Sequence, residues 1–340
     1  MSKNKIFKNK VILITGGTGS FGLAVTKRLL RENLKEIRIF SRDEKKQEEM
    51  RNFIDNKKLK FVVGDVRDQS SLNGAMDNVD FVFHAAALKQ VPSCEFYPME
   101  AIKTNIIGTQ NLINSCKIYN VKKAVFLSTD KSVYPINAMG MSKGLMEKVV
   151  LSNCIYNKSS NVLCITRYGN VIGSRGSVVP LFVNQIKKNI PITITDPKMT
   201  RFLMSLDESV ELVLNALSIG KSGEIFVQKS PSATLEKLCK AIMKIFKKNN
   251  HKINFIGTRH GEKTYETLIS KEEMLRTKIH KNSYIIKPDI RNLNYKKFFT
   301  KGEKKIQKLS EYNSNNTKNL TVEEIVKLFR KIDIRKYEKK

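Results

Sequence analysis

The chain has 340 residues and 41% hydrophobic content, which is enough for two modest domains or one large α/β unit. It contains no stretch near the roughly 18 uninterrupted apolar residues that a membrane span needs and no recognisable secretory signal, so we expect a cytoplasmic protein without a membrane span. The formal charge of +30 comes from dispersed lysines without an aromatic-interleaved basic patch, and we therefore expect anionic small ligands and no nucleic acid as partners.

Short apolar runs alternate with segments of helical spacing from the N-terminus to about residue 171. The predicted strands are residues 11–15, 37–40, 60–65, 81–87, 124–129 and 163–171, and the clearest helices between them are residues 21–33 and 101–119. Because the strands are nearly continuous apolar runs, we expect helices to cover both faces of the sheet. This alternation predicts an α/β fold with a Rossmann-type, doubly wound parallel sheet.

The pattern changes after about Gly173, where shorter strands and proline-containing turns appear. Strands are predicted at residues 191–196, 224–228 and 253–257, and helices at residues 206–218, 233–246 and 322–332. Thr321 is the expected N-cap of the last helix. We divide the chain into a nucleotide-binding Rossmann domain (1–172), a smaller sugar-nucleotide-binding region that interleaves with it (173–270) and a basic C-terminal extension (271–340).

The first predicted strand ends in a glycine-rich loop, TGGTGSFG, over Thr15–Gly22. Gly16 permits a sharp turn, Gly19 permits close approach of a ligand to the backbone, and Gly22 permits the following helix to pack on the strand. The free N–H groups at the start of that helix attract phosphate oxygens. A strand, this loop and a helix in that order predict a site for the pyrophosphate of a dinucleotide.

The end of the second predicted strand bears on the choice of dinucleotide. It reads FSRDE, so Ser41 and Arg42 precede Asp43. A hydroxyl and a guanidinium suit the 2′-phosphate of NADP, whereas an acidic residue suits the 2′-hydroxyl of NAD. We expect NADP, with NAD bound through Asp43 as the alternative. Asp65, which ends the third strand, is expected either to bind the adenine amine or to cap the next turn.

Several motifs occur in order between Thr15 and Glu266. They read TGGTGSFG, FSRDEKKQ, GDVRD, HAAALKQVPSCEFYPMEAIKTNIIGTQN, STDKSVYPINAMGMSK, RYGNVIGSRGSVVPLF, TDPKMTRFLM and GTRHGEKTYE. Together they resemble the extended short-chain dehydrogenase/reductases that act on nucleotide sugars. The resemblance is greatest to the bacterial capsular polysaccharide-biosynthesis branch that contains the UDP-N-acetylglucosamine 4,6-dehydratases (5-inverting). Some relatives in this branch are labelled UDP-glucose 4-epimerases.

The resemblance implies a redox-neutral reaction on a UDP-sugar, in which C4 is oxidised, a base removes the C5 proton, the C6 hydroxyl leaves as water and C6 is reduced. Asp130 and Lys131 match the family's acid and base positions, and Thr129 precedes them at the end of a strand. A lysine can serve as the base if burial lowers its pKa. A UDP-hexose 4-epimerase has no use for such a pair, so Asp130 and Lys131 favour dehydration of UDP-N-acetylglucosamine over UDP-glucose 4-epimerisation. A non-enzymatic NADP-binding protein is a third alternative.

Met139 occupies the position that a tyrosine holds in most of the superfamily, four residues before Lys143. A thioether cannot exchange a proton, so another group must take over the proton transfer during oxidation at C4. The alternatives are Lys131 or Asp130 acting twice, or a water held by Thr129 or Lys143. The resemblance implies that Lys143 itself still binds the nicotinamide ribose.

The resemblance also implies the remaining binding positions. For the cofactor, beyond the residues above, these are Thr18, Ser20, Phe21, Val66, Ala85, Ala86, Tyr168 and Asn170. For the sugar nucleotide they are Lys89, Asn170, Arg201, Arg259 and Glu262. Arginines suit a diphosphate and a glutamate suits ribose hydroxyls, with ordinary surface salt bridges as the alternative. Relatives of this kind form dimers or hexamers, so we expect a homo-oligomer.

Metal and disulfide chemistry is not predicted. The five cysteines include no CxxC pair, which indicates free thiols in a reducing compartment, and no spacing such as HExxH indicates a metal site. His84 is expected to be a hydrogen-bonded residue at a strand end rather than a catalyst, and Asn105 either supports the cofactor site or packs in a helix.

Overall fold

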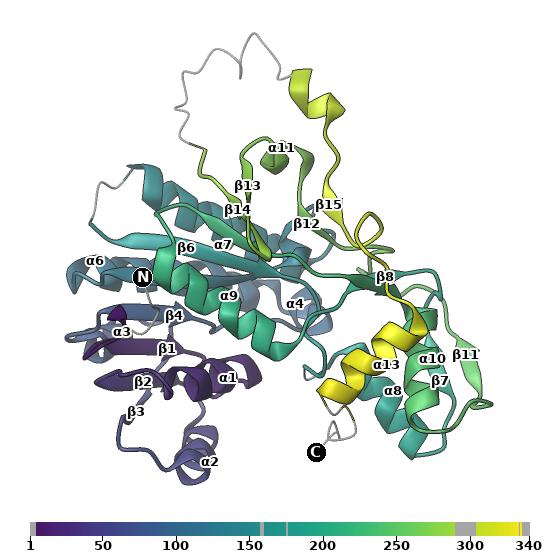
Figure 1. Cartoon of the computed structure of the whole chain (residues 1–340). Coiled ribbons are helices and arrows are strands. Elements are labelled where there is room, and N and C mark those ends of the chain that lie inside the picture. The colour runs from purple at the N-terminus through teal and green to yellow at the C-terminus, as the bar shows by residue number, and fades with distance from the viewer. Residues whose placement is uncertain (1–4, 157–159, 175, 290–303, 333, 335–340) are drawn as a thin grey trace.

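The structure is a computed structural model that describes residues 5–156, 160–174, 176–289, 304–332 and 334. A nine-stranded sheet in the order β13-β14-β9-β6-β5-β4-β1-β2-β3 runs through these ranges (Figure 1). Its strands are β1 (Val11–Thr15), β2 (Glu36–Ser41), β3 (Leu59–Val63), β4 (Phe81–His84), β5 (Lys123–Thr129), β6 (Val162–Tyr168), β9 (Ile225–Gln228), β13 (Thr277–His280) and β14 (Ser283–Ile286).

The sheet is doubly wound, as predicted. Strands β1 to β6 and β9 pair in parallel, and β14 and β13 add an antiparallel edge beyond β9. Every residue of β1, β4 and β9 is buried because helices cover both faces. One face packs against α1 (Ser20–Leu29), α2 (Glu44–Ile54) and α9 (Leu206–Ile219), and the other against α3 (Gln69–Met76), α6 (Gly108–Ile118) and α7 (Ala138–Tyr156).

A second hydrophobic core lies beside the sheet, at the lower right of Figure 1. It contains the helices α8 (Val178–Lys187), α10 (Leu235–Ile245) and α13 (Val322–Lys331) and the parallel strand pair β7 (Ile192–Ile194) and β11 (Ile253–Phe255). The antiparallel pair β8 (Thr200–Phe202) and β10 (Ser232–Thr234) lies between this core and the sheet. The expected cap of α13 is confirmed, because Thr321 and Glu324 form a reciprocal capping box.

Two segments differ from the sequence expectation. Residues 101–119, predicted as one helix, contain α5 (Pro98–Ala101), a π-helical turn η2 (Ile102–Ile107) and then α6. The C-terminal extension is also more integrated than its composition indicated. It supplies β13 and β14 to the main sheet and α13 to the second core. Segments that lie far apart in the sequence therefore contribute to each of these two parts of the fold.

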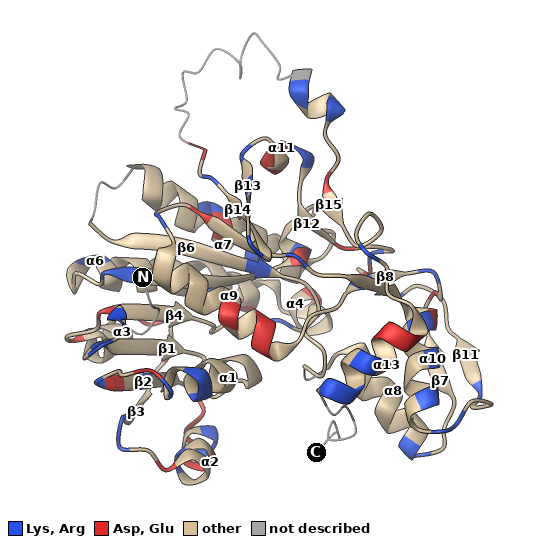
Figure 2. Ribbon diagram, viewed as in Figure 1, with Lys and Arg blue, Asp and Glu red and all other residues tan. Residues whose placement is uncertain are grey.

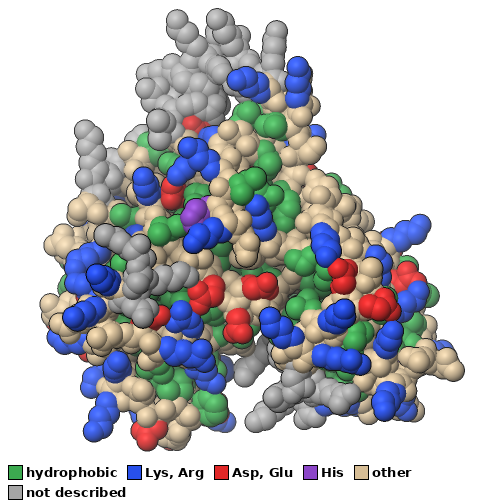
Figure 3. Space-filling model, viewed as in Figure 1, with side chains coloured by type: hydrophobic (Ala, Val, Ile, Leu, Met, Phe, Trp, Pro, Cys, Tyr) green, Lys and Arg blue, Asp and Glu red, His purple; other side chains and the backbone are tan. Residues whose placement is uncertain are grey.

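Charge is dispersed over the surface. Figure 2 shows lysines and arginines on most of the helices, and Figure 3 shows them interspersed with acidic and hydrophobic side chains on the face in view. No helix in the described part of the chain is long and apolar enough to cross a membrane.

Candidate active site

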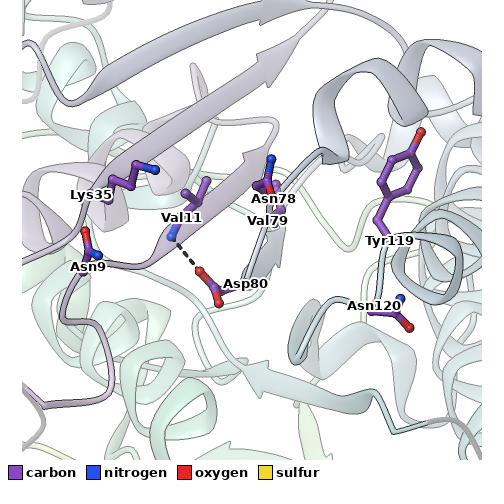
Figure 4. A pocket seen from close by; sticks show the side chains of 8 residues that line it. All are labelled: Asn9, Val11, Lys35, Asn78, Val79, Asp80, Tyr119 and Asn120. Atoms are coloured by element: carbon purple, nitrogen blue, oxygen red, sulfur yellow. Dashed lines mark hydrogen bonds between the residues drawn. The ribbon is translucent and has the colours of Figure 1, made fainter.

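The predicted site residues gather at the carboxyl edge of the parallel strands. In doubly wound sheets, ligands bind at this edge, where loops follow the strands and helices begin. A hollow at the opposite edge contains none of them (Figure 4). Its lining residues are Asn9, Val11, Lys35, Asn78, Val79, Asp80, Tyr119 and Asn120.

The glycine loop fits a dinucleotide because added side chains would collide with the backbone. Gly16 has φ of 66°, and a Cβ there would lie 2.7 Å from the main-chain nitrogen of Ala86. A Cβ on Gly22 would lie 2.6 Å from Cα of Gly17. Gly19 caps α1, whose first residue is Ser20, so the first N–H groups of that helix begin directly after the loop. This cradle of backbone donors suits a pyrophosphate.

We expect Gly22→Ala to weaken dinucleotide binding by about 10-fold or more, because overpacking against fixed backbone displaces the loop. Gly74→Ala is the matched control, since a Cβ at Gly74 in α3 meets nothing within 4 Å. Isothermal titration calorimetry measures the affinities of both variants for NADP and NAD. Circular dichroism checks that both variants are folded. Equal affinities for the two variants would contradict the assignment of this loop.

The loops after β2, β3 and β4 lie next to the glycine loop. The hydroxyls of Thr18 and Ser41 are 2.9 Å apart, and Arg42 is paired with Asp65 at 3.5 Å. Arg67 also binds Asp65, at 2.6 Å, and both arginines lower the pKa of that carboxyl, although burial opposes them. The other predicted residues nearby are Phe21 in the first turn of α1, Val66 after Asp65, and Ala85 and Ala86 after β4.

His84 and Asn105 have structural contacts. His84 is buried between the hydroxyls of Thr15, at 2.7 Å, and Thr109, at 3.2 Å. Burial, with Lys143 nearby, lowers the pKa of His84 to about 3, so its ring is neutral. Asn105 in η2 accepts a hydrogen bond from the Leu88 amide at 2.8 Å and donates one to the Leu88 carbonyl at 3.0 Å. It therefore fixes the loop after β4 that also carries Ala85 and Ala86.

The loop after β5 brings the predicted acid and base into contact. Thr129 donates a hydrogen bond to Oδ1 of Asp130 at 2.8 Å, and Nζ of Lys131 donates to the same oxygen at 3.0 Å. A second carboxylate, Glu266, is 3.2 Å from Lys131. Asp130 and Lys131 lie in the short helix η3 (Asp130–Ser132), and the side chain of Asp130 is 1% exposed.

The pKa of Lys131 is raised, not lowered. We expected burial to lower it, and burial does act in that direction, but Asp130 and Glu266 together outweigh it. Two carboxylates in contact with one ammonium stabilise its charged form. Lys131 therefore rests protonated and must pass its proton to a neighbour before it can act as a base.

Met139 is buried in a small apolar cluster with Cys94 and Ala101. Lys143, one helical turn later, is also buried and donates a hydrogen bond to the Leu127 carbonyl at 2.6 Å. Burial lowers the pKa of Lys143 to about 8, although Glu147 acts in the opposite direction. Met139 thus contributes packing, whereas the ammonium of Lys143 lies beside the carboxyl end of β5.

Tyr168 is the last residue of β6 and Asn170 follows it, so both lie at the same edge of the sheet. The ring of Tyr168 stacks on Phe21 with centroids 5.2 Å apart. Burial, with a smaller effect of Asp130, raises the pKa of Tyr168. Oδ1 of Asn170 is buried and has no hydrogen-bond partner within the described residues, as expected of an atom that awaits a ligand.

The predicted substrate residues divide into two groups. Arg201 of β8 and Glu262 form an ion pair at 3.1 Å, and the main-chain amide of Arg259 donates to Glu262 at 3.3 Å. Arg201 is buried, whereas the side chain of Arg259 is exposed. Lys89 is exposed on the loop after β4. Arg201 and Glu262 thus lie together, while Lys89 belongs to a different loop.

Sequence reasoning missed Glu266 and a buried ion-pair network beneath the catalytic loop. Arg167 of β6 binds Glu147 of α7 at 2.5 Å and Glu273 at 2.9 Å. Glu147 also accepts hydrogen bonds from the hydroxyls of Ser128 and Ser132, which flank the acid and base. Glu266 ends the GTRHGEKTYE motif, which was the one available signal for it.

A dinucleotide loop and an acid–base cluster thus lie at one edge of a doubly wound sheet, and the class that this arrangement defines is the extended short-chain dehydrogenase/reductase. The sequence profile described as "Polysaccharide biosynthesis protein" matches residues 12–288, and that described as "Polysaccharide biosynthesis protein C-terminal" matches residues 289–335. The chain belongs to this polysaccharide biosynthesis family and is an enzyme of the nucleotide-sugar dehydratase/epimerase type. The resemblance and the fold predicted from the sequence are therefore confirmed.

Similar proteins carry the names of both activities. A Rickettsia bellii (strain OSU 85-389) protein named UDP-glucose 4-epimerase is 58% identical over 333 residues, which cover 96% of this chain and 97% of that protein. The X-ray structure of Pen from Bacillus thuringiensis is 36% identical, with a TM-score of 0.86 over 96% of this chain and 99% of that one. DesIV, a dTDP-glucose 4,6-dehydratase from Streptomyces venezuelae solved with NAD bound, shares the fold at 21% identity, with a TM-score of 0.68 over 75% of this chain and 86% of that one.

Proposed function

We propose that the chain catalyses the NADP-dependent 4,6-dehydration of UDP-N-acetylglucosamine with inversion at C5. The observation that carries this proposal is the contact between Asp130 and Lys131 at 3.0 Å in a buried site at the carboxyl edge of the sheet. Dehydration needs an acid at C6 and a base at C5, whereas 4-epimerisation needs only oxidation, rotation of the ketone and reduction. In this proposal residues 1–172 bind the nucleotide cofactor and residues 173–270 bind the UDP-sugar.

The acid–base cluster supplies both groups by a single internal proton shift. When bound, the nicotinamide supplies reversible oxidation at C4 and reduction at C6. Lys131 passes one proton to Asp130 along their existing hydrogen bond, which produces a neutral amine and a carboxylic acid together. The amine then takes the C5 proton, and Asp130 protonates the departing C6 hydroxyl. Both groups return to their resting charges, and the proton that leaves the C4 hydroxyl on oxidation is balanced by the proton that C5 takes up from the opposite face after reduction at C6.

Product analysis tests the proposal. The purified protein with NADP is incubated with UDP-N-acetylglucosamine, and the products are separated and weighed by mass spectrometry. We expect a product that is lighter by one water. An unchanged mass for all UDP-sugar species would contradict the proposal.

UDP-glucose 4-epimerisation is the second candidate, and the names of the similar Rickettsia proteins favour it. It would use the same cofactor loop and the same oxidation at C4, but not the acid–base cluster. Incubation with UDP-glucose and proton NMR of the product distinguishes it, because formation of UDP-galactose without loss of water identifies an epimerase.

The loop after β2 supports NADP over NAD. Asp43 is engaged as the N-cap of α2, where it accepts a hydrogen bond from the Lys46 amide at 3.0 Å and pairs with the Lys46 ammonium. Arg42 is 53% exposed and lies at the carboxyl end of β2, where the adenosine ribose binds in this fold. The Arg42 guanidinium pairs with Asp65 at 3.5 Å but remains exposed, and a guanidinium beside the Ser41 hydroxyl suits a 2′-phosphate.

We therefore expect Arg42→Ala to weaken NADP binding by about 10- to 100-fold, since it removes charge-assisted hydrogen bonds. NAD binding should change by less than about threefold, because NAD has no 2′-phosphate for the arginine to contact. Lys45→Ala removes one exposed positive charge from the same region and serves as the control. Titration calorimetry measures the affinities of the wild type and both variants for NADP and NAD. An equal loss of affinity for the two cofactors in Arg42→Ala would contradict the preference for NADP.

A further inference from the structure

The ammonium of Lys131 lies between two buried carboxylates that come from distant parts of the chain. Its Nζ is 3.0 Å from Oδ1 of Asp130 in η3 and 3.2 Å from Oε1 of Glu266, just before β12 (Thr267–Ile269). The side chains of Asp130 and Glu266 are 1% and 3% exposed. Their second oxygens, Oδ2 and Oε2, are buried without a hydrogen-bond partner among the residues that the structure describes. Asp130 alone has a role in the proposed reaction, so Glu266 requires an explanation.

The other ionisable groups that face this cluster have partners elsewhere. Arg201 of β8 forms its ion pair with a different carboxylate at 3.1 Å, and Lys263 donates to a main-chain carbonyl at 2.6 Å. Tyr168 of β6 faces Asp130 and is not charged in the neutral range, because burial raises its pKa. Lys131 is therefore the cation that contacts both carboxylates, and its orientation depends on them.

The C-terminal segment holds the backbone of Glu266 in place. The Glu266 amide donates to Oγ of Ser314 at 3.0 Å, and the Ser314 amide donates to the Glu266 carbonyl at 2.8 Å. Ser314 is fully buried, and its Oγ is 2.7 Å from the hydroxyl of Thr200 in β8. It follows β15 (Tyr312–Asn313), which pairs with β12. The segment that the sequence left without a role thus contacts the active site directly.

On the basis of the proposed function, we propose that Glu266 positions Lys131 opposite Asp130, and that the C-terminal segment around Ser314 holds Glu266 there. A lysine ammonium has three N–H donors on a flexible stem. The two carboxylates accept two of these N–H groups and leave the third direction of the nitrogen for the reacting atom. When Lys131 passes a proton to Asp130, Glu266 stays charged and keeps the resulting amine oriented. Glu266 acts through Lys131 and is a positioning residue.

Glu266→Gln tests the positioning, because it keeps the shape of the side chain and removes its charge. We expect turnover of UDP-N-acetylglucosamine to fall by about 10- to 100-fold while KM stays within about threefold. We also expect the alkaline limb of the pH profile of kcat/KM, where the Lys131–Asp130 pair loses its shared proton, to move to lower pH by about one unit. The sign follows from the lost carboxylate, which had stabilised the ammonium and so raised the pKa of Lys131.

Two further variants complete the test. Ser314→Ala removes the hydroxyl that accepts a hydrogen bond from the Glu266 amide. It should lower kcat by about 3- to 10-fold, in the same direction as Glu266→Gln. Glu323→Gln makes the same chemical change in α13, on an exposed side chain paired with Lys244, and should leave kcat and the pH profile unchanged. Thermal unfolding of each variant shows whether its fold is retained.

The outcomes separate this inference from the function on which it rests. Wild-type turnover and pH profile in Glu266→Gln would overturn the positioning role, as would a loss of turnover with an unmoved alkaline limb and a lowered melting temperature. If the wild-type protein releases no water from UDP-N-acetylglucosamine, the proposed function is overturned and this inference with it. A shifted alkaline limb in an intact Glu266→Gln protein supports both.

Discussion

Replacing Lys131 with methionine is expected to lower turnover of UDP-N-acetylglucosamine by about 100- to 10,000-fold, the range that a general base contributes. The substitution keeps a long apolar stem and removes the group that accepts the C5 proton. It also leaves Asp130 and Glu266 buried without their shared cation. Steady-state kinetics with mass detection of the product measures the loss.

The control for this variant is Lys244→Met, which removes an exposed lysine that pairs with Glu323 on the second core. It should retain wild-type turnover. Binding of UDP to Lys131→Met, measured by titration calorimetry, should remain within about threefold of wild type because the residues proposed to bind UDP are other side chains, Arg201, Arg259 and Glu262. Near-normal turnover of Lys131→Met would remove Lys131 from the mechanism and favour the epimerase.

The largest effect on stability is expected for Arg167→Met. Arg167 is 2% exposed and binds Glu147, Glu273 and the Leu268 carbonyl. Removing one partner of a buried ion pair leaves an uncompensated charge, and we expect the free energy of unfolding to fall by about 3–5 kcal/mol. Urea denaturation followed by circular dichroism measures it. Lys240→Met, at an exposed pair with Glu236, is the control and should change stability by less than about 1 kcal/mol.

The same network predicts a pH dependence of stability. Burial alone would raise the pKa of Glu273, but Arg167 outweighs it and lowers that pKa from its usual 4.5 to about 2. A carboxyl with a depressed pKa in the folded state stabilises the fold above about pH 4.5, and this contribution is lost as the pH falls toward 2. In Arg167→Met this contribution should be absent. The difference in the free energy of unfolding between the wild type and the variant should therefore shrink as the pH falls. A constant difference across this range would contradict the assignment.

Features that depend on residues close together in the sequence could be predicted from the sequence. The glycine loop is readable because the three glycines and the elements on each side of them are contiguous. Asp130 and Lys131 directly follow a predicted strand, so their place at the carboxyl end of that strand could be predicted, while their roles as acid and base came from the resemblance. The alternation of apolar strands with helices predicted the parallel sheet because both faces had to be covered.

Features that depend on distant contacts could not be predicted. The contact of Glu266 with Lys131 follows from how the β12 region returns to the sheet, and no local pattern encodes that return. The raised pKa of Lys131 follows from the same contact, which is why burial alone predicted the wrong direction. Strands β13 and β14 are short and lie in a Lys-rich extension, so the pairing of β13 with β14 and of β14 with β9 had no strong periodic signal.

The most direct test of the central claim is to incubate the wild-type enzyme with UDP-N-acetylglucosamine and NADP in D2O and to record the proton NMR spectrum of the product. The acid–base cluster predicts a product that has lost one water and carries deuterium at C5, because Lys131 removes the C5 proton and the proton that C5 takes up from the opposite face comes from a group in exchange with solvent. A product that keeps its C5 proton and its C6 hydroxyl would contradict the claim and leave Asp130 and Lys131 without a role in the chemistry.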